Sequence, residues 1–243
     1  MRRATSMVVL CLAVGGIVLC SCSVVNAARK VAHDVEGNKA TIDAFSGTVK
    51  SGEDATFEAT YATTGAAPAT VVYAVRPPTG LAFQETPSGS TGGSGTTSVD
   101  LIVNSSGEFS CAPSSPGQPP TCQKLGAATA TAENKLFDFY TPAHWVAFLK
   151  DFSLAAGLAG DKVTSSTMTV NGFALQCVDF DAPGIPGTST ICTTAQGILG
   201  YVKVASDTTS FEITSYSATP SASLFALPAG ATVTTAPPSE AHT

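Results

Sequence analysis

The stretch TFEATYATTGAAPATVVYAVRPP, residues 56–78, decides the fold class of this chain. In TFEATYA, Phe57, Ala59 and Tyr61 alternate with polar residues, which is typical of a strand with one buried face. The next apolar run, TVVYAVR, ends at Pro77, where a strand must stop or lie at the edge of a sheet. The stretch therefore predicts β-structure with a period of two.

Similar segments recur along the rest of the chain. LAFQE and SVDLIVN flank a Gly/Ser/Thr loop at 88–98, and GEFSCA and CQKL predict a hairpin. After residue 160 the chain continues with STMTV, FALQCVDF, STIC, ILGYVKVA and TSFEITSYS, the last of which places Phe211 and Ile213 on one face. Segments rich in Thr, Val and aromatic residues, separated by regular turn signals, predict an antiparallel sheet of about ten strands.

Two segments have helical spacing instead. Residues 38–50, NKATIDAFSGTVK, predict a short amphipathic helix. In the segment 135–160, Thr141 is a candidate N-cap and Pro142 stands at the first helical position. The apolar face of this second helix consists of Trp145, Phe148, Leu149 and Phe152. The expected fold class is α+β, with one domain over residues 37–236 and a polar tail at 237–243, and so long a sheet must curl or be capped by helices.

The N-terminus has the composition of an export signal. A basic start is followed by the uncharged run MVVLCLAVGGIVL, which is short for a transmembrane helix. LCSC, ending at Cys22, resembles a bacterial lipobox, with Leu19 at −3 and Ser21 at −1. We therefore expect a signal peptide at 1–21, an acylated Cys22 and a tether at 22–36. The alternative is an ordinary secretory signal that is cleaved near Ala27.

Charge and cysteine content agree with an exported protein. Loss of Arg2 and Arg3 with the signal leaves ten basic against 18 acidic residues, a net charge of −8, which disfavours nucleic acid as a partner. Four cysteines remain besides Cys22, and an even number in an exported chain predicts disulfides. Each sequence-local pair brackets a loop rich in Pro, Gly and Ser, so we expect Cys111–Cys122 and Cys177–Cys192 rather than a zinc site.

The sequence offers little for catalysis. The histidines are His33, His144 and His242, and only His144, at the start of the second predicted helix, could lie near a site. Asp179 and Asp181 in DFD could bind calcium, but the Pro-Gly that follows favours the entry to a turn. We expect no enzyme activity, no cofactor and no metal.

The whole mature chain resembles actinobacterial lipoproteins of the LolA/LppX-like superfamily, the group that includes LppX, LprA, LprF and LprG. The matching features are the lipobox LCSC, FEATYATTG, TVVYAVRPP, the two cysteine loops, GILGYV and the ending TSYSATPSASLFALPAGATV. The resemblance implies a half-barrel, in which an antiparallel sheet of about eleven strands curls around helices that pack on its concave face. It also implies a hollow that accepts the acyl chains of lipids or lipoproteins.

The residues expected to line that hollow are the four on the second predicted helix, together with Phe57, Tyr61, Phe211 and Ile213 of the sheet. The expected function is that of a carrier or chaperone, palmitoylated at its N-terminus and held on the extracellular face of the cytoplasmic membrane. Two alternatives stay open. Envelope-stress regulators use a similar half-barrel to bind partner proteins, and a structural surface lipoprotein would have a filled core.

Overall fold

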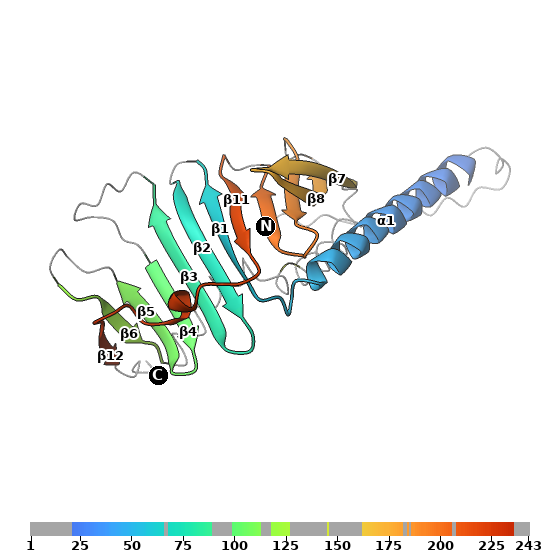
Figure 1. Ribbon diagram of the computed structural model, residues 1–243. Helices are drawn as coiled ribbons and strands as arrows, with labels where there is room; N and C mark the ends of the chain where they lie inside the picture. The colour runs from blue at the N-terminus through green and yellow to red at the C-terminus, as the bar shows by residue number, and fades with distance from the viewer. Residues whose placement is uncertain are drawn as a thin grey trace, which may run out of the picture.

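The computed structural model describes residues 21–65, 68–88, 99–112, 118–126, 145, 162–181, 184, 186–205 and 208–235. Within these residues the chain is mostly β, with one long helix (Figure 1). The elements of the first half are α1 (Ser21–Lys50), β1 (Phe57–Thr63), β2 (Ala69–Arg76), β3 (Gly80–Pro87), β4 (Val99–Asn104), β5 (Gly107–Ala112) and β6 (Thr121–Lys124). The second half contributes β7 (Lys162–Val170), β8 (Phe173–Asp181), β9 (Ser189–Thr193), β10 (Leu199–Lys203), β11 (Ser210–Ser217), the 3₁₀ helix η1 (Ala222–Phe225) and β12 (Thr232–Thr235).

The twelve strands of the described residues form one sheet, in the order β12-β6-β5-β4-β3-β2-β1-β11-β10-β9-β8-β7. Every pairing is antiparallel except that of β12 with β6, which is parallel. The two halves of the chain meet where β1 pairs with β11. The sheet is curled and does not close, as the half-barrel expectation requires (Figure 1). At its β7 end, β7 contacts β11 and β8 contacts β10, although neither pair is adjacent in the sheet.

One face of the sheet carries the main core, and we call it the core face. Its central residues are Phe57, Ala59 and Tyr61 of β1, which are fully buried as their alternation with polar residues predicts. Phe57 packs edge-on against Tyr73 of β2, with ring centroids 5.8 Å apart. Tyr61 stacks on Phe211 of β11 at 4.4 Å. These cross-strand aromatic contacts join the two halves of the sheet where β1 lies between β2 and β11.

Helix α1 packs mainly against the β7 end of the sheet. Ile42, Phe45 and Val49, the apolar stripe that predicted a helix over 38–50, are buried in the main core, and the helix contacts β7 and β8. The helix also runs through residues 22–36, which the sequence assigned to a tether, and Figure 1 shows this part projecting away from the sheet. No helix in the described part of the chain is long and apolar enough to span a membrane.

The end of α1 fits closely against the turn before β10. Gly197 in that turn has a φ of +77°, and a Cβ atom there would lie 2.4 Å from the carbonyl oxygen of Thr48. Gly52, just after the helix, is similarly close to Gly197. Two glycines are therefore required for the helix to reach the sheet at this point.

Both predicted disulfides are present. Cys111 of β5 lies directly opposite Cys122 of β6, and Cys177 of β8 lies directly opposite Cys192 of β9. In each case the bond joins the second strand from an edge of the sheet to the third. The two bonds thus occupy equivalent positions near the two open edges.

The opposite face of the sheet is crossed by the C-terminal segment. Residues 218–235, which we call the strap, leave β11, form η1, pass over β3 and β4 and end as β12 beside β6 (Figure 1). The strap covers two small clusters that are separate from the main core. One contains Ala74 and Ala82 with Phe225, and the other contains Ile102, Phe109 and the Cys111–Cys122 bond.

Candidate binding surfaces

The sheet residues expected to line a hollow lie together on the core face. Phe57 and Tyr61 of β1 and Phe211 and Ile213 of β11 are buried, and Tyr61 and Ile213 are directly opposite each other. They form one continuous wall rather than separate patches. The cluster to which they belong extends over nine neighbouring strands, from β4 to β7.

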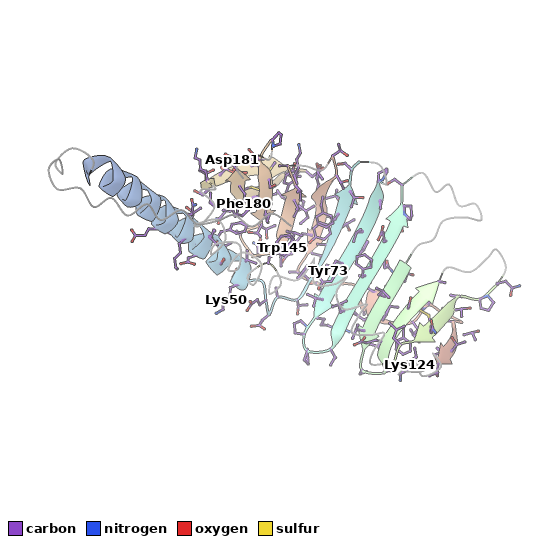
Figure 2. All side chains as sticks on the ribbon, turned by 180° about the vertical axis from the view of Figure 1, so that it is seen from behind. Lys50, Tyr73, Lys124, Trp145, Phe180 and Asp181 are labelled. Atoms are coloured by element: carbon purple, nitrogen blue, oxygen red, sulfur yellow. A yellow bond between two sulfur atoms is a disulfide. The ribbon has the colours of Figure 1, made fainter. Side chains whose placement is uncertain are left out.

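Trp145 is the described residue of the second predicted helix. It has helical backbone, is 7% exposed and belongs to the same cluster as the wall. Figure 2 shows it over the sheet between Phe180 of β8 and Tyr73 of β2. The other three candidates, Phe148, Leu149 and Phe152, lie outside the described residues, and so does His144.

A groove of about 720 Å³ lies between α1 and the β7 edge of the sheet. The groove is lined by Ala40, Thr41, Ala44 and Phe45 of α1 and by Ser165, Ser166, Thr167, Gln176 and Cys177 of the sheet. Small and hydroxyl-bearing side chains predominate, and Thr48 donates a hydrogen bond to Gln176 at 3.3 Å. Such a lining is more polar than an acyl chain requires. The groove was not predicted from the sequence.

Asn38 closes one end of the contact between α1 and β7. Its side-chain oxygen accepts the backbone N–H of Val163 at 3.1 Å, and both residues are buried. The N–H of Val163 therefore does not need a partner strand at this edge.

Two acidic residues of β8 accept hydrogen bonds from the chain that follows. Asp181, at the end of β8, accepts a hydrogen bond from Thr188 at 2.6 Å, and Asp179 accepts one at 2.7 Å from Thr190, its partner on β9. No group of three or more His, Cys, Asp or Glu with metal-binding geometry is found among the described residues.

Two side chains have shifted pKa values. Burial raises the pKa of Asp100 on β4, which lies opposite Gln84 of β3 and Cys111 of β5. Burial, and then the neighbouring Glu212 carboxylate, raise the pKa of Tyr201 on β10. In both cases burial disfavours the charged form.

A third surface lies under the strap, and its residues were not predicted from the sequence. Phe225 is buried against Ala74 and Ala82, and a Cβ atom on Gly80 would lie 3.2 Å from its ring. The guanidinium of Arg76 stands 4.5 Å from the centre of the same ring. The small residues on neighbouring strands form a recess for one aromatic side chain. Because Ala74 and Ala82 pair across two strands, only the register of β2 with β3 reveals this recess.

Comparison with known proteins gives distant structural matches only. No family model matches the chain, and no curated protein matches it. The crystal structure of MucB is similar at a TM-score of 0.45 and 10% identity, covering 78% of this chain and 64% of that one. The crystal structure of MucB in complex with MucA(peri) is similar at a TM-score of 0.41 and 9% identity, covering 75% and 57%. The chain thus spans less than two thirds of the length of either match.

Cys22 lies in the first turn of α1, which begins at Ser21. The preceding residues, which contain the basic start, the apolar run and Leu19, lie outside the described part of the chain. Acylation of Cys22 is therefore a prediction from the sequence.

Proposed function

We propose that this chain is an exported lipoprotein that binds the acyl chains of a lipid or lipidated molecule on the core face of its sheet. The observation that carries the proposal is the apolar cluster over nine neighbouring strands of a curled, open sheet. A binding role of this kind involves no catalysis by the chain itself, and apolar burial supplies the binding free energy.

The way the core face is covered supports this proposal. From α1 the cluster receives Ile42, Phe45 and Val49, all at the β7 end of the sheet. Near the centre of the sheet, Trp145 packs on the core face. Among the described residues there, it is the one in the cluster that belongs neither to a strand nor to a turn between strands. We expect a ligand chain bound within this cluster to lie close to Trp145.

Attachment to the membrane is proposed from the lipobox. Acyl groups on Cys22 would hold the protein on the outer face of the cytoplasmic membrane, with each buried CH₂ contributing about 0.8 kcal/mol. The projecting half of α1 would then separate the sheet from the bilayer, and the carrier could exchange acyl chains with that membrane.

The only tryptophan of the chain provides a direct test. Bromine atoms quench tryptophan fluorescence on contact, so a brominated fatty acid should quench Trp145 in a saturable manner. The same fatty acid without bromine is the matched control and should compete for the site. Organic extracts of the purified protein, analysed by mass spectrometry, should also contain a bound lipid. Absence of both saturable quenching and copurified lipid would contradict the proposal.

A second candidate function is a partner-binding module, and the groove beside α1 favours it. Ser165, Ser166 and Thr167 of the edge strand β7 line this groove with small, polar side chains that suit a protein segment better than an acyl chain. Photo-crosslinking from Thr167, with Thr60 on β1 as a control position, would distinguish the two. A specific membrane-protein crosslink without bound lipid would favour the partner-binding function.

A further inference from the structure

The buried ring of Phe225 anchors the strap on the sheet, and hydrogen bonds hold the strap as well, including one from the Ser221 N–H to the Glu58 carboxylate at 2.9 Å. Phe225 is 4% exposed, whereas Leu224 and Leu227 on either side of it are only partly buried. Its carbonyl oxygen accepts a hydrogen bond from the Asn104 side chain at 2.9 Å, and its ring lies under Arg76. The recess is thus specific for an aromatic ring with a cation above it.

The terminal part of the strap makes a weak strand contact. Strand β12 has four residues, all of them exposed, and it forms the only parallel pairing among the described strands. Val233 is 47% exposed on this edge. Backbone hydrogen bonds therefore contribute more than side-chain burial to the position of β12.

The sheet beneath the strap is complete without it. β2, β3, β4, β5 and β6 pair with one another in an unbroken antiparallel series. Departure of the strap would break the β6–β12 ladder and expose Ile102, Phe109 and the recess at Ala74 and Ala82, while the main core lies on the other face. The covered surface is an apolar strip on the sheet that ends at a strand edge.

We propose that this surface is a docking site for an extended peptide of a partner protein, and that the strap is its built-in competitor. The strap itself shows the chemistry of the ligand that fits. An aromatic side chain fills the recess under Arg76, an apolar residue two positions later covers Ile102 and Phe109, and a short strand then pairs in parallel with β6. This inference concerns the face opposite the proposed acyl-binding surface and does not depend on it.

The test uses the full chain and a fluorescein-labelled peptide with the strap sequence, residues 221–235. Wild-type protein should bind the peptide weakly, because its own strap occupies the site. Phe225→Ala in the protein empties the recess and should increase peptide affinity at least tenfold, as measured by fluorescence anisotropy. A peptide with Ala in place of its phenylalanine is the matched control and should not bind either protein. Adding Arg76→Ala to the Phe225→Ala protein should reduce the gain.

The results can overturn the proposal in two ways. If the Phe225→Ala protein keeps its wild-type circular dichroism but does not bind the peptide, or binds the control peptide equally well, the surface is not a docking site. If that variant does not fold, hydrogen exchange of the wild type decides. The proposal requires the amides of β12 to exchange at least a hundredfold faster than those of β2 and β3, and equal rates would overturn it.

Discussion

The side-chain oxygen of Asn38 accepts a hydrogen bond from the backbone N–H of Val163. This bond fixes the position of α1 against β7, the last strand at one open edge of the sheet. Both residues are buried, so the bond is shielded from water. The free edge of a sheet otherwise presents unpaired N–H groups that attract other strands. One helical side chain therefore both docks the helix and satisfies an edge donor.

Asn38→Ala should reduce the free energy of unfolding by about 1–3 kcal/mol, because it leaves a buried N–H without its acceptor. Urea denaturation measures the change. Lys39→Ala is the matched control one position along the helix. It removes an exposed ion pair with Asp43 and should cost less than about 1 kcal/mol. Equal losses in the two variants would show that the Asn38 bond has no special role.

Gly197→Ala should be much more destabilising than Gly230→Ala. The two glycines have φ values of +77° and +74°, so both substitutions add the strain of a left-handed backbone, about 1–2 kcal/mol. Only at Gly197 would the new methyl group meet backbone, 2.4 Å from the Thr48 carbonyl oxygen, whereas nothing lies within 4 Å at Gly230. We expect a further loss of about 1–3 kcal/mol at Gly197, measured by denaturation. Similar losses at both sites would refute the close fit of α1.

Removal of either disulfide should destabilise the protein by about 3 kcal/mol in the chain-entropy model, since the cysteines are separated by 11 and 15 residues. The variants are Cys111→Ala with Cys122→Ala, and Cys177→Ala with Cys192→Ala. Peptide mapping under non-reducing conditions checks the pairing first. A peptide that links Cys111 to Cys177 would refute the arrangement.

Asp100→Asn should stabilise the protein near neutral pH. The pKa of Asp100 is raised above its ordinary value of 3.8, so the folded state binds this proton more tightly than the unfolded state does. Protonation of Asp100 contributes its full stabilisation to the folded state below pH 3.8. This contribution is lost as pH rises through the folded-state pKa. The advantage of the variant should therefore shrink as pH falls through the folded-state pKa and should level off below pH 3.8. Asp54→Asn, at an exposed position, should change stability by less than about 0.5 kcal/mol. A lower stability of Asp100→Asn at pH 7 would contradict the prediction.

Cys22→Ala should abolish acylation and either release the protein from the membrane or leave its signal uncleaved. Cell fractionation and mass spectrometry of the N-terminal peptide measure both outcomes. Cys20→Ala is the control, because Leu19 is too large for the residue that precedes the acceptor, and this variant should behave as wild type. A processed, membrane-bound Cys22→Ala protein would eliminate the lipobox interpretation.

The strands and their buried faces could be predicted from local patterns. The alternation in TFEATYA gives both the position of β1 and its buried residues, and turn-rich loops between neighbouring cysteines give the local disulfide pairing. Strand order could not be predicted in this way. The pairing of β1 with β11 brings together residues more than 140 positions apart, and nothing in either strand specifies the other.

Two elements were missed for different reasons. Strand β12 has no buried face, so its side chains show no alternation, and its parallel partner β6 is distant in the sequence. The first half of α1 did carry a signal, because Val24, Ala28, Val31 and Val35 recur at helical spacing. That spacing indicates that residues 22–36 continue the helix predicted for 38–50.

The positions of the disulfides have a consequence for how this sheet comes apart. An open sheet frays from its ends, one strand at a time, and each loss exposes the next edge. Here β7 or β12 can detach alone, but the next ladder at each end is crossed by a covalent bond. Fraying therefore stops after one strand under oxidising conditions. In a reducing compartment the strands of the same sheet would detach one after another from both ends. The lifetime of the folded sheet therefore depends on the redox state of its surroundings.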